Sequence, residues 1–136
     1  MALSVALMWL PSAVAMRFVS DPGPPIEYIT HYCSYISRLP IGYGNWFPII
    51  IAILAFTVLL MLIASVRRTA RGRDSKKPVL ICLSICVITS PLSWLIFGGA
   101  YEITIVGVIV FALHVVTLAL QYIFKRAGAM DVSPAS

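Results

Sequence analysis

Three long apolar runs dominate the sequence and limit the folds that are open to it. They cover residues 49–66, 79–97 and 103–124, and the first contains no charged residue, glycine or proline. Eighteen helical residues extend about 27 Å, close to the thickness of the hydrocarbon core of a bilayer. Charged residues make up 11% of the chain, against roughly 25% in soluble domains. The sequence therefore predicts an all-α integral membrane protein, folded as a single helical bundle.

The N-terminal apolar segment, at about residues 2–19, is the shortest candidate span. It contains Pro11 and reaches Arg17. We interpret it as a first transmembrane helix, which gives four spans in total. A cleaved signal peptide is the alternative, because Ala13-Val14-Ala15 resembles a small-x-small cleavage site, although a basic segment before the apolar run is missing. Both interpretations place residues 20–47 outside the membrane.

A dense basic patch lies between the first two long runs, at residues 67–77. It contains six of the ten Lys and Arg residues, whereas residues 17–47 contain two and the tail after residue 124 contains two. Because cytoplasmic loops of membrane proteins are enriched in Lys and Arg, this distribution predicts that the patch and the C-terminus are cytoplasmic. With four spans in the cell membrane, the N-terminus is expected to be cytoplasmic as well.

We expect the basic patch to contact anionic lipid headgroups beside the membrane. It is too brief and too poor in aromatic residues to predict binding to nucleic acid. The tail at 127–136 is small and polar, and is predicted to be disordered. The residues expected to contact headgroups are Arg67, Arg68, Arg71, Arg73, Lys76 and Lys77.

The outer loop contains a pattern typical of a short amphipathic helix at about residues 25–38, beginning after Pro24-Pro25. Glu27 and His31 lie on its polar face and are spaced to form a pair. The helix is expected to lie on the outer membrane surface or on the bundle, either as a plain surface helix or as a contact site for a partner. Its apolar face contains Ile26, Ile29, Cys33 and Ile36.

Residues 41–48, Ile-Gly-Tyr-Gly-Asn-Trp-Phe-Pro, resemble the selectivity filter of potassium channels. The resemblance implies that backbone carbonyls of Gly42, Tyr43 and Gly44 replace the water around an ion in a fourfold assembly. The sequence departs from that family at Pro40, where the channels have a threonine.

The chain as a whole resembles the small, uncharacterised multi-pass membrane proteins that are common in bacteria. In these proteins a turn like residues 40–48 leads into the next span. The resemblance implies a membrane fold and no particular activity.

His114 is an ionisable residue near the centre of the last span, and such residues are candidates for function. Polar residues of the preceding span, Thr89 and Ser90, lie at about the same depth. Because the connection between these spans is short, they are expected to be antiparallel neighbours. A neutral His114 is then expected to form a hydrogen bond with Thr89 or Ser90 and join the two helices. A proton relay through His114 is the alternative.

The three cysteines, Cys33, Cys82 and Cys86, are too few and too scattered to predict a disulfide framework. Cys82 and Cys86 are interpreted as small packing residues. No metal site is predicted, because His114 is expected to lie at another depth from the two cysteines. The sequence contains no recognisable catalytic set or cofactor motif, so we expect a protein that is not an enzyme and has no cofactor.

We therefore predict a non-enzymatic accessory or interaction subunit of the membrane, which contacts lipids and either another membrane protein or a second copy of itself. One alternative is a homo-oligomeric ion channel that uses Gly42, Tyr43 and Gly44. Another is proton or solute transport that involves His114.

Overall fold

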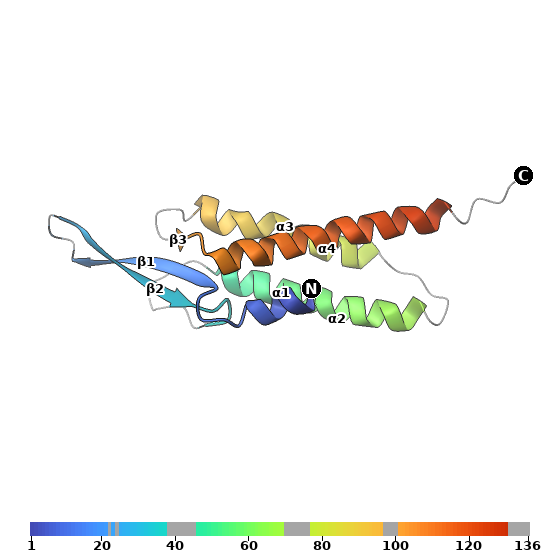
Figure 1. The fold of residues 1–136 in the computed structure, drawn as a ribbon, viewed down its shortest axis with the longest axis horizontal. Coiled ribbons are helices and arrows are strands. Elements are labelled where there is room, and N and C mark those ends of the chain that lie inside the picture. Colours follow the sequence, from blue (N-terminus) through green and yellow to red (C-terminus); the bar gives the residue numbers. More distant parts are fainter. Residues whose placement is uncertain (22, 24, 38–45, 70–76, 97–100, 131–136) are drawn as a thin grey trace, which may run out of the picture.

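The computed structural model describes residues 1–21, 23, 25–37, 46–69, 77–96 and 101–130. Its long helices run roughly along one axis, and a β-hairpin projects from one end of them (Figure 1). In chain order the elements are α1 (Ala2–Leu7), β1 (Val14–Asp21), β2 (Glu27–Cys33), α2 (Phe47–Thr69), α3 (Lys77–Ile96), β3 (Tyr101–Glu102) and α4 (Ile105–Met130).

Three helices, α2, α3 and α4, are long and apolar enough to cross a membrane. They contain 23, 20 and 26 residues, or about 35, 30 and 39 Å at 1.5 Å per residue. α3 packs against both α2 and α4. The helices predicted at 49–66, 79–97 and 103–124 are thus confirmed.

α1 is a short helix that packs against α2 and α4. Its six residues extend only about 9 Å, so the N-terminal end lies beside the middle of α2 (Figure 1). Where the sequence predicted one span over residues 2–19, the structure has a helix, a turn around Pro11 and a strand. Proline lacks the N–H that would continue the helix. Residues 2–19 therefore do not form one continuous helix.

The strands form an antiparallel sheet in the order β2-β1-β3. β1 and β2 pair over their whole length as a hairpin, with Val14 opposite Cys33, and β3 pairs with the other edge of β1, where Ala15 lies opposite Glu102. An ion pair between Arg17 and Glu102 joins the same two strands. The predicted all-α class therefore describes the bundle but omits this sheet.

The amphipathic helix predicted over about 25–38 is wrong, because the described part of this segment contains β2. Tyr28, Thr30 and Tyr32 are residue types that favour strands, and β1 supplies the neighbouring strand. In an extended strand Glu27 and His31 are about 13 Å apart along the chain, so the pair expected on one helical face cannot form.

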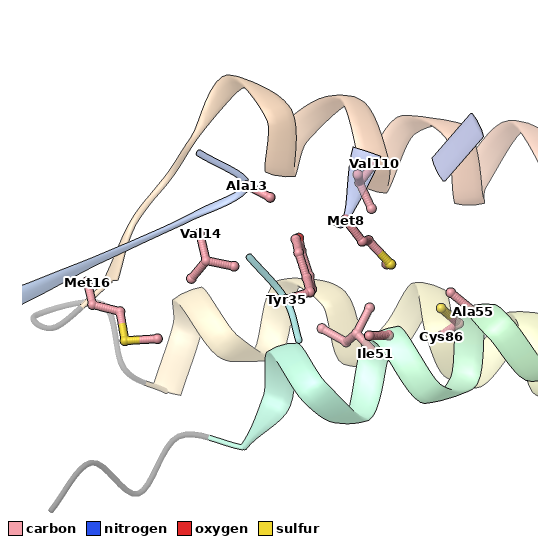
Figure 2. Packing of buried hydrophobic residues seen from close by; sticks show 10 residues of the cluster. Met8, Ala13, Val14, Met16, Tyr35, Ile51, Ala55, Cys86 and Val110 are labelled. Atoms are coloured by element: carbon pink, nitrogen blue, oxygen red, sulfur yellow. The ribbon is translucent and has the colours of Figure 1, made fainter. Parts of the chain in front are cut away.

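The buried apolar residues form two clusters. The larger joins Met8, after α1, and the start of β1 to α2, α3 and α4, and Figure 2 shows its members. Tyr35, which follows β2, lies within it and anchors the end of the hairpin to the bundle. The smaller cluster, made of Val58, Val79 and Leu83, lies later in α2 and earlier in α3.

Thr104 fixes the start of α4 against the chain that enters β1. Its hydroxyl accepts a hydrogen bond from the Gly107 N–H at 2.9 Å, as expected of an N-cap, and donates one to the Ala13 carbonyl at 2.7 Å. A Cβ atom at Gly107 would lie 3.0 Å from the Thr104 hydroxyl and 3.5 Å from the Ala13 carbonyl. The absence of a side chain at Gly107 therefore allows this close approach.

At its other end α4 continues to Met130. Residues 127–130, which were predicted to be disordered, are therefore helical. The rest of the predicted tail, 131–136, lies outside the described residues.

Candidate functional site

His114 and Cys86 form a buried polar pair between α4 and α3. Both residues have an exposed fraction of 0%. Nδ1 of His114 lies 3.6 Å from Sγ of Cys86, within hydrogen-bonding distance for sulfur. His114 is also central in the apolar stretch Ile105–Phe124. The expectation that His114 lies at another depth from the cysteines is therefore wrong for Cys86.

The second ring nitrogen of His114, Nε2, is buried and has no hydrogen-bond partner among the described residues. If the Cys86 thiol donates to Nδ1, the Nε2–H is left unpaired; if Nδ1–H donates to the sulfur, Nε2 is an unpaired acceptor. In both cases the unpaired atom lowers the folding stability by about 1–3 kcal/mol. The pair joins two helices but is not fully satisfied.

The hydroxyls of Thr89 and Ser90 bond within their own helix. Thr89 Oγ1 donates to the Ile85 carbonyl at 2.8 Å, and Ser90 Oγ donates to the Cys86 carbonyl at 2.8 Å. Hydroxyls inside helices commonly bond back to the preceding turn in this way. The side chain that the structure places against Nδ1 of His114 is thus Cys86, one turn before the two residues expected from the sequence.

The pair resembles the thiol and base of a cysteine nucleophile, but an activated nucleophile also requires a third group that orients the base. Glu27 and Glu102, which are described acids, lie in the strands at the end of the bundle, and Glu102 bonds Arg17. Within the described ranges no three His, Cys, Asp or Glu side chains lie close enough together to hold a metal ion. The pair therefore provides two donor atoms in an apolar environment.

An apolar groove lies between α1 and α2. Its volume is about 290 Å³, close to the lower limit of small-molecule sites. Trp9, Ile53 and Phe56 on its rim are more than half exposed. Such a groove suits an aliphatic chain better than a polar ligand. Its lining residues are Val5, Met8, Trp9, Ile36, Ile49, Ala52, Ile53, Phe56 and Thr57.

The β1–β2 hairpin carries exposed apolar and aromatic side chains. Tyr28, Ile29 and Tyr32 of β2 are 56%, 57% and 57% exposed. β2 also lies at the edge of the sheet, and no described strand pairs with its outer side. An unpaired strand with exposed aromatic residues is suited to contact with another protein.

The end of α2 and the start of α3 lie at the opposite end of the bundle from the hairpin (Figure 1). Arg67 and Arg68 lie in the last turn of α2, and Lys77 is the first residue of α3. All three are exposed. The other basic residues assigned to lipid headgroups, Arg71, Arg73 and Lys76, lie outside the described residues. So do the residues of the filter-like motif, Gly42, Tyr43 and Gly44.

Comparisons of the chain with protein-family models, with curated proteins and with solved structures find no match. Its function therefore has to be inferred from the arrangement of its own residues.

The partnership of Cys86 with His114 was missed in the sequence, although a signal for it exists. In two antiparallel helices, residues at equal distances from the connection face each other, and both Cys86 and His114 are 14 positions from residue 100. Leu83 and Leu118 differ from this relation by one position and pack in one cluster. Counting outward from the turn would have paired His114 with Cys86 rather than with Thr89 or Ser90.

Proposed function

We propose that this chain is a small, non-enzymatic protein of the cell membrane that acts as an interaction subunit. The observation that carries this proposal is the apolar outer surface of the long helices. Only 22%, 24% and 17% of the apolar windows of α2, α3 and α4 are buried inside the chain. Large side chains such as Ile53, Leu60 and Ile88 are exposed on them. Lipid matches such a surface, whereas in water it would cause aggregation.

The charge distribution supports one orientation of the three spans. Arg67, Arg68 and Lys77 lie at the end of the bundle that the positive-inside rule assigns to the cytoplasm. The C-terminal end of α4 is then cytoplasmic, and the β1–β2 hairpin is outside. α1 enters the bundle from the outer side without crossing the membrane. The basic residues contact lipid headgroups at the inner surface.

The shape of the outer part supports a contact role. The hairpin extends beyond the helices (Figure 1) and presents Tyr28, Ile29 and Tyr32 away from the core. Its partner is another membrane protein or a second copy of the chain. A lipid acyl chain occupies the apolar groove between α1 and α2.

Cysteine labelling tests the orientation. In a Cys82→Ala/Cys86→Ala variant, Cys33 is expected to react with a membrane-impermeant maleimide in intact cells. In a chain whose native cysteines are replaced by alanine, Arg68→Cys is the matched control and is expected to react only after permeabilisation. Reversed labelling of the two positions would reject the proposed orientation.

Photo-crosslinking tests the contact role. A photoreactive residue at position 28 in the hairpin is expected to give discrete protein adducts in the membrane. The same residue at position 122, an exposed site on α4, is the control and is expected to react mainly with lipid. Equal adduct formation at the two positions would contradict a contact role for the hairpin.

Proton movement through His114 is a second candidate function, and the unpaired Nε2 atom favours it. Purified protein in liposomes distinguishes the candidates. An interaction subunit is expected to give no flux above empty liposomes. Proton flux that is lost in His114→Ala would support the relay, and potassium flux that is lost in Gly42→Ala would support the filter-like motif.

A further inference from the structure

The environment of the Cys86–His114 pair contains a third soft donor atom. Met8, which directly follows α1, has an exposed fraction of 1% and belongs to the same buried cluster as Cys86. Figure 2 shows its thioether directed into the space on the Cys86 side of Val110. A thioether and a thiol thus lie in one buried cluster, and the imidazole of His114 contacts that thiol.

The separation of the two measured donors suits a shared metal ion. Metal–sulfur and metal–nitrogen bonds of about 2.3 and 2.0 Å, at an angle of about 110–120°, place the ligand atoms about 3.5–3.7 Å apart. Sγ of Cys86 and Nδ1 of His114 are 3.6 Å apart. The same distance also suits a hydrogen bond, so the distance alone does not identify a metal. The types of donor atom and the surrounding medium decide which metal would bind.

We propose that Met8, Cys86 and His114 form a binding site for monovalent copper in the centre of the bundle. Thiolate and thioether ligands select Cu(I), which is stable with two or three soft ligands. On binding, the Cys86 thiol loses its proton to water, Nδ1 of His114 donates a lone pair, and the sulfur of Met8 completes the set. Oxidation states do not change.

The charge of the bound complex favours a monovalent ion over a divalent one in the centre of the bundle. One thiolate with Cu(I) gives a neutral complex, whereas Zn(II) in the same site would leave a net positive charge in the apolar core. Burying an uncompensated charge is strongly unfavourable. The described residues around the pair supply no second anionic ligand, so the site is expected to discriminate against Zn(II).

The apolar groove gives the site a connection to the surface. Met8 lines this groove and is also part of the cluster that contains Cys86. α1 contains only six residues, so a small displacement of this helix would expose the pair. Met8 is therefore the ligand best placed to meet an incoming ion.

Competition with a chromophoric Cu(I) chelator, under reducing conditions and with the full chain in detergent, tests the proposal. We expect one Cu(I) to bind to a Cys33→Ser chain, because Cys33 is a thiol outside the site. Changing a residue that only supports a metal ligand lowers the metal affinity about 10–100-fold. Loss of a direct ligand in Cys86→Ser or His114→Ala is therefore expected to weaken binding by about 100-fold. Met8→Leu is expected to weaken it less.

Matched controls separate ligation from folding. Cys82→Ser removes a thiol one turn from Cys86, and Met61→Leu removes a thioether from α2; neither is expected to change the affinity. Met8→Leu preserves side-chain volume, and it is expected to lose the thermal stabilisation that Cu(I) gives the unmodified chain. Affinity that is unchanged in Cys86→Ser or His114→Ala, or binding of Zn(II) as tight as that of Cu(I), would overturn the proposal. The proposal is independent of the contact role of the hairpin.

Discussion

At the residue scale, the unpaired nitrogen of His114 lowers the stability of the metal-free protein. His114→Leu removes the unpaired atom and keeps an apolar side chain between the helices, so it is expected to leave the unfolding midpoint unchanged or to raise it. Cys86→Ala leaves both ring nitrogens without a partner and is expected to destabilise the fold by about 1–3 kcal/mol. Thermal unfolding in detergent measures both effects.

Cys82→Ala is the control for that comparison, since Cys82 is only half-buried and lies one turn from Cys86. It should have little effect on the midpoint. A large loss of stability in His114→Leu, with Cys86→Ala tolerated, would show that Nε2 has a partner in solution.

Tyr35 provides a titration at the same scale. Burial raises the pKa of its phenol from about 10 to about 12. Because the folded state has the higher pKa, the stability that Tyr35 contributes is complete below about pH 10 and is lost as the pH rises through about 12. Tyrosinate absorbance is expected to show one late transition that is absent in Tyr35→Phe. Tyr32→Phe, at an exposed position, is the control and should keep the late transition of Tyr35.

At the element scale, the hydroxyl of Thr104 joins α4 to the chain entering β1. Thr104→Val keeps the shape but removes the N-cap bond to Gly107 and the bond to the Ala13 carbonyl. The expected loss is about 1–2 kcal/mol, in the range measured for N-cap residues. Thr57→Val is the control, because that hydroxyl bonds only one carbonyl of its own helix, that of Ile53. Equal midpoints for the two variants in thermal unfolding would contradict the role of the cap.

The long helices could be predicted from sequence because one property, the length of an apolar run, determines them. The hairpin could not, because its two strands were assigned to different elements. Residues 14–19 were interpreted as the end of a span, so Glu27–Cys33 had no visible partner strand. The spacing of Ile26, Ile29 and Cys33 then fitted a helix. Pro22-Gly23-Pro24 between two segments rich in β-branched and aromatic residues was the signal for a turn.

The same limit applies to the candidate site. His114 could be identified as a buried ionisable residue, but its partner depends on the register of α3 and α4. The contribution of Met8 depends on where α1 packs, and neither can be read from a single segment.

At the scale of the whole molecule, α1 occupies the position of a fourth helix for only part of the length of the bundle. It packs against α2 and α4, while α3 packs against the same two helices. In the membrane orientation proposed above, the first residues of this short helix are expected to lie at a depth that neither aqueous phase reaches. The arrangement therefore predicts that cysteines introduced into α1 react with water-soluble reagents differently from cysteines in a complete first span.

Three single-cysteine variants in a cysteine-free chain test this arrangement in intact and inverted membrane vesicles. A cysteine at position 33 is expected to react with an impermeant maleimide from the outside, and one at position 68 from the inside. Leu3→Cys, on an exposed face of α1, is expected to react from neither side, because that face meets lipid. It should still react with a small, membrane-permeant maleimide. Reaction of Leu3→Cys from the same side as position 68 would instead indicate a fourth helix that crosses the membrane.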